Sequence, residues 1–259
     1  MPLALGAQNA RVNAARDLLE KGGRAAHRAY AIEGATLLEE ARRSGVAVRE
    51  LYVTGSGAAA SPEVARLEAA GVPTYLLADR TFAKISDVET PTGILAVIDL
   101  PSAPLVSLFE GPGLVLGVAD LADPGNLGTL LRAAEAFGAK GALIGDLGVD
   151  PFHPKVVRAG MGAHFRLPIV VGTPEALEPV MVGAGVQGIG LAASGASLRA
   201  LTWPERALMV VGHERHGLGR WAPLCPTVAG IPMAPRAESL NAGVAGSIAL
   251  YEAFCARLV

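Results

Sequence analysis

The sequence predicts an α/β protein in two parts: a small α/β domain over residues 1–100, a linker over 101–112 and a parallel-sheet α/β domain over 113–259. The 259 residues, 51% of them hydrophobic, suffice for two cores. The stretch "DLPSAPLVSLFEGPG" has three prolines and two glycines, and it separates two halves that differ in their pattern of predicted helices and strands. Beyond it, Val/Ile/Leu-rich runs alternate with helical stretches, as in a parallel sheet covered on both faces.

The first half contains helix and strand signals in close succession. Apolar residues at helical spacing predict a helix over 9–21, and "EGATLLEEARRSG" predicts a second helix that ends at Gly45. A serine cap, a proline in the first turn and a final glycine make "SPEVARLEAAG" a further helix. Strands are predicted at "VRELYVT", "PTYLLA" and "GILAVIDL".

The second half contains six apolar runs of strand length. Because ligands of parallel sheets bind outside the carboxyl ends of the strands, the loops that follow these runs should carry the chemistry. The six predicted strands are Leu114–Val118, Ala142–Ile144, Leu167–Val171, Gly188–Ala192, Ala207–Val211 and Thr227–Ile231.

Composition limits the classes of protein. No uncharged apolar run reaches the about 18 residues that span a bilayer, and the N-terminus does not have the pattern of a signal peptide. Cys225 and Cys255 are isolated, which favours a reduced cytoplasmic protein without structural zinc or disulfides. We therefore expect a cytoplasmic protein that binds neither membrane nor metal.

The net charge of −2 does not by itself indicate a nucleic-acid-binding protein. Basic residues do gather near the N-terminus, where they can contact phosphates or form an ordinary solvated helix face. The residues concerned are Arg11, Arg16, Lys21, Arg24 and Arg28, against Asp17 and Glu20.

Two loops after predicted strands carry polar residues. In "DPGNLGTLLRAAEAFG", Asn126 can be a plain helix cap, and Arg132 can be a surface arginine or face a partner or phosphate. The glycines match neither GxGxxG nor GxxxxGK[ST], which disfavours a dinucleotide or NTP site. For "VVGHERHGL", two interpretations remain: a surface turn, or a loop that binds a ligand close to Gly212. The spacing of its histidines matches no zinc signature.

Two further stretches are ambiguous. Lys155 and Arg158 share a helix face after Pro154 and can form a basic rim or solvated surface. The C-terminal "SLNAGVAGSIALYEAF" predicts a buried helix, although Gly243 and Gly246 each cost about 1 kcal/mol of helix propensity. Small residues at helical spacing there would let another backbone come close.

Taken together, these motifs resemble the SpoU/TrmH branch of the SPOUT RNA methyltransferases. The resemblance rests on "DPGNLGTLLRAAEAFG", "VVGHERHGL" and "IPMAPRAESLNAGVAGSIALYE" in this order. The stretches "DPFHPKVVRAGMGAHFRLPI" and "ETPTGILAV" also fit, and "RAAHRAYAIEGATLLEEA" resembles the substrate-binding domain akin to ribosomal protein L30e. The resemblance implies a parallel sheet with a deep trefoil knot, S-adenosylmethionine as cofactor, methylation of a ribose 2′-hydroxyl of RNA, and a homodimer.

The resemblance also assigns roles to single residues. Those expected to act in catalysis are Arg132, Asn126, Glu214, Ser239 and Asn241. Those expected to bind the cofactor are Ala192, Gly212, His213, Ile231, Met233 and Leu240. Contacts to RNA are expected from Arg11, Arg24, Arg28, Lys155 and Arg158.

The sequence departs from the family pattern at two places and leaves the substrate open. His213 stands where a small polar residue is usual, and Ala242-Gly243 replace Val-Ser. The L30e-like domain favours 23S ribosomal RNA as substrate. Transfer RNA, or a non-catalytic role in RNA binding or ribosome assembly, are the alternatives.

Overall fold

The computed structural model describes residues 2–237 and 239–257 of the chain, which forms two compact units. The first comprises Met1–Leu100 with Phe152–Phe165, and the second Pro101–Pro151 with Arg166–Val259. The sequence placed residues 152–165 in the second domain. Their contacts group them with the first unit, because Phe152 packs on Tyr30 with ring centroids 5.0 Å apart and Arg158 pairs with Asp87 at 2.9 Å.

The first unit is built on a mixed five-stranded sheet with the order β1-β4-β3-β5-β2. Strand β5 runs antiparallel to β2 and β3, whereas β4 pairs in parallel with β1 and β3. The strands are β1 (Leu3–Ala4), β2 (Ala29–Glu33), β3 (Val48–Val53), β4 (Thr74–Leu76) and β5 (Ile94–Asp99). The helices are α1 (Ala10–Asp17), α2 (Lys21–His27), α3 (Ala35–Arg43), α4 (Gly55–Ala60), α5 (Pro62–Ala69), α6 (Asp79–Phe82) and α8 (Pro154–Gly160).

Two local predictions for this unit were incomplete. The helix predicted over 9–21 divides into α1 and α2, with the break after Asp17. Strand β2 was missed because it follows α2 directly, without a glycine or proline to mark the change. The chain reverses at Arg28, which ends α2 in the left-handed conformation at φ 50°.

The second unit contains a six-stranded sheet in which every pair of neighbours is parallel, as the sequence predicted. The strand order is β11-β9-β10-β6-β7-β8. The strands are β6 (Gly113–Val118), β7 (Gly141–Gly145), β8 (Ile169–Gly172), β9 (Gln187–Ser197), β10 (Arg206–Val211) and β11 (Thr227–Gly230). The longer helices are α7 (Pro124–Ala136), α9 (Pro174–Ala184) and α10 (Ala242–Arg257), joined by the short helical turns η1 (Leu105–Phe109), η2 (Ala163–Phe165, in the first unit), η3 (Leu198–Ala200) and η4 (Gly219–Leu224).

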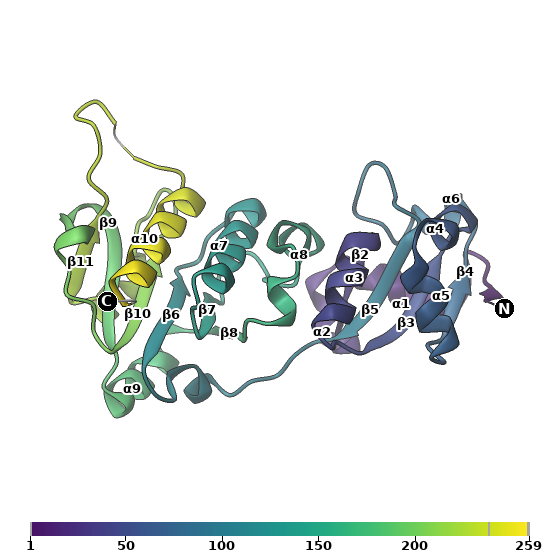
Figure 1. Ribbon diagram of the computed structural model, residues 1–259, viewed down its shortest axis with the longest axis horizontal. Helices are drawn as coiled ribbons and strands as arrows, with labels where there is room; N and C mark the ends of the chain where they lie inside the picture. The colour runs from purple at the N-terminus through teal and green to yellow at the C-terminus, as the bar shows by residue number, and fades with distance from the viewer. Residues whose placement is uncertain (1, 238, 258–259) are drawn as a thin grey trace. The chain divides into compact units, whose positions relative to one another are not determined.

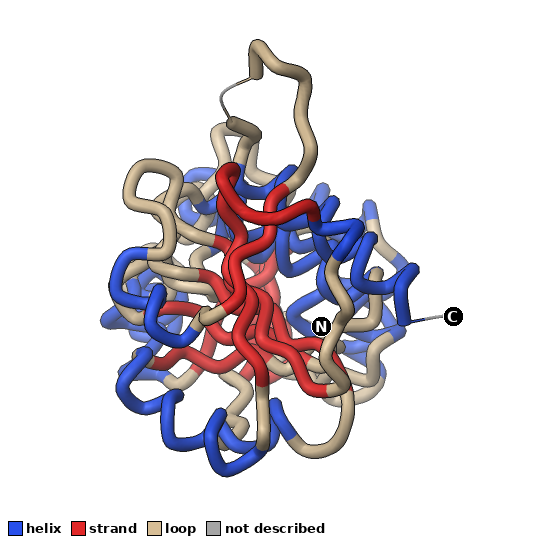
Figure 2. Tube along the Cα trace, turned by 90° about the vertical axis from the view of Figure 1, so that its left-hand side faces the viewer, coloured by secondary structure: helices blue, strands red, loops and turns tan. Residues whose placement is uncertain are grey.

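A loop leaves the sheet after β11. Figure 2 shows the strands between helices, with a loop that stands away from the sheet; Figure 1 identifies it as the segment between β11 and α10. The register of β11 on β9 shifts between Val228 and Ala229, so the far end of β9 pairs next to this loop. The trefoil knot that the resemblance implies stays a prediction.

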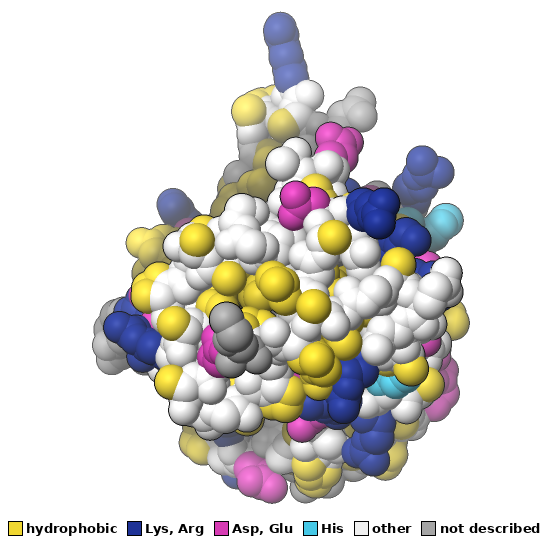
Figure 3. Space-filling view, turned by 90° about the vertical axis from the view of Figure 1, so that its right-hand side faces the viewer, with side chains coloured by type: hydrophobic (Ala, Val, Ile, Leu, Met, Phe, Trp, Pro, Cys, Tyr) yellow, Lys and Arg dark blue, Asp and Glu magenta, His cyan; other side chains and the backbone are white. Residues whose placement is uncertain are grey.

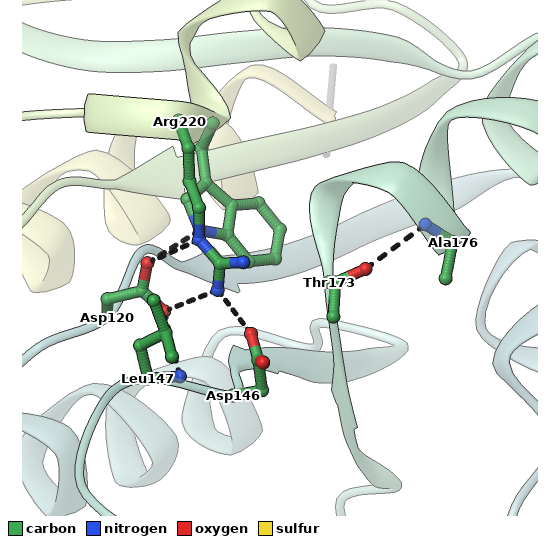
Figure 4. Close-up of polar contacts among 7 residues, drawn as sticks. Asp120, Asp146, Leu147, Thr173, Ala176 and Arg220 are labelled. Atoms are coloured by element: carbon green, nitrogen blue, oxygen red, sulfur yellow. Dashed lines mark hydrogen bonds and ion pairs between the residues drawn. The ribbon is translucent and has the colours of Figure 1, made fainter.

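An ion-pair network joins three loops at the carboxyl ends of β6 and β7 (Figure 4). Arg220 of η4 donates to Asp120 at 3.0 and 3.1 Å and also to Asp146. The indole of Trp221 donates to Asp120 at 3.2 Å. Burial raises the pKa of Asp120, but the hydrogen bonds from Arg220 and Trp221 outweigh it and hold the pKa below its ordinary value. These contacts fasten the loop that begins at Gly212 to the loop that precedes α7.

Helix α10 packs its small residues on α7 of the same chain. Gly246 is buried against Leu130 and Val211, and a Cβ there would overlap Leu130 Cδ2 and lie 2.9 Å from Val211 Cγ2. The small-residue face therefore serves packing within this unit. The apolar side chains that α10 leaves exposed are Val244 and Tyr251, at 47% and 51%.

Gly246→Leu is expected to lower the free energy of unfolding by about 2 kcal/mol, because the added side chain must displace Leu130 from a closely packed position. Urea unfolding monitored by circular dichroism measures the change. Gly183→Ala in α9 is the control, because its Cβ would meet no atom within 4 Å; it should be neutral or stabilising. Equal midpoints for Gly246→Leu and the wild type would contradict this packing.

Among the described residues, no helix is both long enough and apolar enough to cross a membrane.

Candidate active site

A cavity of about 380 Å³ lies at the carboxyl ends of β9, β10 and β11. This is the edge of the parallel sheet at which such folds bind their ligands. Its volume lies within the range of small-molecule and cofactor sites. Its walls come from the ends of the three strands, the loop after β10, the loop after β11 and the first turn of α10: Leu191, Ala192, Ala193, Val211, Gly212, His213, Glu214, Gly217, Ala229, Gly230, Ile231, Met233, Ser239, Leu240, Asn241, Ala242 and Ala245.

All six residues that the resemblance assigned to the cofactor line this cavity, although their roles stay predictions. Three of the residues assigned to catalysis, Glu214, Ser239 and Asn241, line it as well. About half of the lining residues are glycine, alanine or serine. Gly230 is one that close packing requires, because a Cβ there would lie 2.8 Å from the carbonyl oxygen of Ala192 and 2.9 Å from that of Gly195.

We name the first cavity the cofactor cavity, after the role that the resemblance predicts for its residues. A second, more open pocket of about 630 Å³ adjoins it. We call it the outer pocket. It is lined by Ala122, Asp123, Asn126, His213, Glu214, Arg215, His216 and Asn241. His213, Glu214 and Asn241 belong to both, so they form the junction between the two spaces. A group bound in one space and a group bound in the other would meet at these three residues.

Asn126 and Glu214 connect two loops at this junction. The side-chain amide of Asn126 donates to Glu214 Oε1 at 2.9 Å. Asn126 is not the helix cap that one interpretation of the sequence allowed. The cap of α7 is Asp123, whose Oδ1 accepts from the backbone N–H of Asn126 at 2.7 Å. The amide of Asn126 is thereby left to hold Glu214.

Asn241 and Gly243 lie at the start of α10, close to Asn126. Oδ1 of Asn241 accepts from the backbone N–H of Val244 at 3.2 Å, at the start of α10. A Cβ at Gly243 would lie 3.2 Å from Oδ1 of Asn126 and 3.2 Å from Oδ1 of Asn241. The glycine that departs from the family pattern therefore lies between the two site asparagines.

Arg132 is the predicted catalytic residue that the structure does not bring to the two cavities. It lies six residues beyond Asn126 on α7, is exposed, and is absent from the walls of both the cofactor cavity and the outer pocket. Six residues turn a helix through roughly 240°, so its side chain leaves α7 on a different face. Its catalytic role stays a prediction.

The predicted RNA contacts differ in how available they are. The prediction that Arg24 contacts RNA does not fit the structure, because Arg24 is only 2% exposed. Its guanidinium donates to the carbonyl oxygens of Leu18 and Leu19 at 2.7 and 2.9 Å, where it closes the turn between α1 and α2. Arg11 is exposed but pairs with Glu50 at 3.0 Å, and Arg158 pairs with Asp87.

Arg28 and Lys155 are exposed, and among the described residues neither has an ion-pair partner. The sequence could not separate them from Arg24, because burial of an arginine by backbone carbonyls has no signal in composition. On the face of the first unit seen in Figure 3, apolar side chains gather near the middle, and Lys and Arg side chains lie both beside them and toward the rim.

Sequence reasoning missed Asp123 as the cap of α7 and did not assign roles to Arg215 and His216. Asp123 could have been found from its place just before Pro124, a favoured first helical position. No three His, Cys, Asp or Glu residues in the described part of the chain are grouped so as to hold a metal ion. Cys225 is buried, and burial raises its thiol pKa to about 12.

The fold and the site together define an enzyme-like α/β protein with a cavity at the ends of parallel strands. The chain matches the model of the SpoU rRNA Methylase family over residues 113–251 and that of the MRM3-like substrate binding domain over residues 9–96. Because the first match spans more than half of it, this chain belongs to the SpoU rRNA methylase family.

Relatives of known name match over nearly the whole chain. The 23S rRNA (guanosine(2553)-2′-O)-methyltransferase RlmP of Bacillus subtilis is 32% identical over 95% of this chain and 96% of its own length. The solved structure of the SpoU methyltransferase AviRb from Streptomyces viridochromogenes in complex with AdoMet is similar, with a TM-score of 0.86, 27% identity, and coverage of 97% and 99% of the two chains. The AdoMet-bound rRNA methyltransferase from Sinorhizobium meliloti has a TM-score of 0.84, 27% identity, and coverage of 96% of each chain.

Proposed function

We propose that this protein transfers a methyl group from S-adenosylmethionine to a ribose 2′-hydroxyl of ribosomal RNA, in the cytoplasm. The observation that carries the proposal is the pair of adjoining cavities that share His213, Glu214 and Asn241. The relatives named above act on 23S ribosomal RNA or are structures with bound AdoMet, which favours this cofactor and this class of RNA.

The walls of the cofactor cavity suit S-adenosylmethionine. The volume fits a ligand of this size, and the apolar side chains of Leu191, Ile231 and Leu240 offer contact area to an adenine ring. Gly212 and Gly230 both line the cavity, and each lies so close to neighbouring backbone that a Cβ would overlap it. When bound, the cofactor supplies an electrophilic methyl group on a sulfonium.

The residues at the junction would orient the ribose. Glu214 is held by Asn126, and its second carboxylate oxygen can accept a hydrogen bond from the 2′-hydroxyl, which aligns an oxygen lone pair with the cofactor cavity. Asn241 is fixed by its bond to Val244 and borders the same space. Positioning of this kind can supply several kcal/mol of the barrier to transfer.

We further propose that the protein works as a homodimer. Val244 and Tyr251 leave an apolar strip exposed on α10, and Phe137 at the end of α7 packs edge-on against Tyr251 with centroids 5.5 Å apart. A second copy that covered this strip would bury it from water. Arg132, which is exposed on α7 and lines neither cavity, would then face the other subunit.

The proposed function is tested by incubating the purified protein with S-adenosylmethionine labelled at the methyl group. Protein-free ribosomal RNA and total transfer RNA, each from cells that lack this protein, are the two substrates. We expect label in large-subunit ribosomal RNA. Label in transfer RNA alone would transfer the proposal to that substrate. Binding of the cofactor in calorimetry without label in either RNA would contradict an enzymatic role on these RNAs.

A further inference from the structure

The loop that closes the outer pocket, residues 213–217, has a fixed shape. His213 and Gly217 exchange two backbone hydrogen bonds, from His213 N–H to Gly217 O at 2.8 Å and from Gly217 N–H to His213 O at 2.9 Å. Gly217 takes a φ of 58°, which a glycine adopts without strain. The side chains of Arg215 and His216 are therefore presented to the pocket from a tight, closed turn. We call this segment the 213–217 loop.

The imidazole of His213 is oriented by this turn. The backbone N–H of Arg215 donates to its Nδ1 at 3.0 Å. Because Nδ1 accepts, the neutral ring must carry its proton on Nε2. The ring of His216 packs against that of His213 with centroids 4.7 Å apart. His213 therefore offers a hydrogen-bond donor at Nε2, at the junction of the two cavities.

The outer pocket contains two carboxylates, so an RNA phosphate that enters it needs hydrogen-bond donors and positive charge. Asp123 and Glu214 both line it, and each has a carboxylate oxygen already occupied by Asn126. An RNA strand brings further negative charge in its phosphates. Nδ1 of His213 lies 3.8 Å from Oε2 of Glu214. In the part of the chain that the structure describes, Nε2 of His213 and the guanidinium of Arg215 have no hydrogen-bond acceptor of their own. Nε2 of His213 can donate a hydrogen bond to a phosphate oxygen, and the guanidinium of Arg215 can also offset the charge of the phosphate.

We propose that the 213–217 loop binds the phosphodiester that adjoins the acceptor ribose. Arg215 donates from its guanidinium, His213 donates from Nε2, and His216 supports the ring of His213 by packing on it. The proposal rests on the proposed function, because the ribose at the junction belongs to RNA. It gives Arg215 the phosphate contact that sequence reasoning gave to Arg132. Arginine suits this role, because its planar set of donors matches the geometry of a phosphate.

RNA binding measured at several salt concentrations tests the proposal, with protein-free ribosomal RNA as the probe and no cofactor present. Arg215→Gln is expected to weaken binding about tenfold at low salt and to reduce the slope of log K against log salt by about 0.7–0.9. Arg199→Gln removes one exposed positive charge that lines neither cavity, and it should leave the slope unchanged. Calorimetry should show the affinity for S-adenosylmethionine unchanged within about twofold in both variants, because the phosphate contact lies outside the cofactor cavity.

A matched pair of substitutions isolates the donor on His213. In His213→Asn, the amide oxygen can replace Nδ1 as acceptor for Arg215 N–H, but no donor remains where Nε2 was. In His213→Gln, an amide donor can reach the position of Nε2. We expect His213→Asn to raise the Kd for RNA about fivefold and His213→Gln to restore most of the affinity.

The readout is binding, so it separates this proposal from the proposed function. A protein that binds RNA with the expected salt slopes but transfers no methyl group would contradict the function and support the loop. A slope for Arg215→Gln equal to that of Arg199→Gln overturns the assignment of Arg215, whether or not the wild type methylates RNA. Equal affinities of His213→Asn and His213→Gln overturn the role of Nε2.

Discussion

Replacement of Glu214 by alanine is expected to lower the rate of methyl transfer about 100-fold or more. The substitution removes the acceptor that holds the Asn126 amide at 2.9 Å and the carboxylate that lines both cavities. Small errors in the placement of reacting groups cost factors of this size. Single-turnover transfer of labelled methyl groups to saturating RNA measures the rate, and calorimetry measures cofactor affinity, which we expect to change only a few-fold.

Glu214→Gln is the matched variant. Its amide oxygen can still accept from Asn126, so the two loops stay connected, and we expect its rate to lie between that of the wild type and that of Glu214→Ala. Asn126→Ala combined with Glu214→Ala should cost less than the product of the single effects, because the two residues act as one unit. A Glu214→Ala protein with the wild-type rate would contradict the placement of the reaction at this junction.

Replacement of Arg220 by methionine is expected to lower the free energy of unfolding by about 3 kcal/mol. Asp120 and Asp146 would each lose a charged hydrogen-bond donor. The side chain of Asp120 is only 19% exposed, so water could replace this donor only in part. Denaturant unfolding near neutral pH measures this loss. Arg80→Met, at an exposed arginine of the first unit, is the control and should change stability by less than about 0.5 kcal/mol.

The effect of Arg220→Met should depend on pH in a defined direction. The pKa of Asp120 in the folded protein lies below the ordinary value of 3.8. The stabilisation is therefore complete above that value and is lost as the pH falls through the folded-state pKa, where Asp120 becomes protonated. The difference between wild type and variant should shrink below about pH 4. A difference that grows on acidification would contradict the ion-pair network.

The residues of the Arg220 ion-pair network lie close in sequence to residues of the outer pocket. Arg220 lies three residues after the 213–217 loop, and Asp120 lies three residues before the cap Asp123. We therefore expect the Arg220 contacts to help hold the amide of Asn126 at 2.9 Å from Oε1 of Glu214. Arg220→Met should for this reason also slow methyl transfer under conditions in which the variant remains folded.

The sequence predicted the parallel sheet, and the residues that the resemblance assigned to the cofactor meet in one cavity, although their role stays a prediction. Val-, Ile- and Leu-rich strands alternate with helices, and the loops after β9, β10 and β11 converge wherever such strands lie side by side. The individual residues in these loops came from the resemblance and not from the pattern of strands and helices. The predicted linker likewise contains a short apolar turn, η1.

The features that escaped prediction depend on contacts between residues far apart in the chain. Arg24 looks like any basic residue of a helix face until the fold places two carbonyl oxygens against its guanidinium. Asn126 and Asp123 are both good helix caps by type, and only the start of α7 decides between them. The tautomer of His213 depends on one backbone N–H two residues away.

The central claim is that this chain methylates the 2′-hydroxyl of a ribose in ribosomal RNA. Ribosomal RNA treated with the purified protein and S-adenosylmethionine can be digested to nucleosides and analysed by mass spectrometry, with Glu214→Ala as the parallel sample. We predict one 2′-O-methylated nucleoside whose methyl group stays with the sugar on fragmentation, and which is reduced about 100-fold or more in the variant. A methyl group that stays with the base, or equal amounts from both proteins, would contradict the claim.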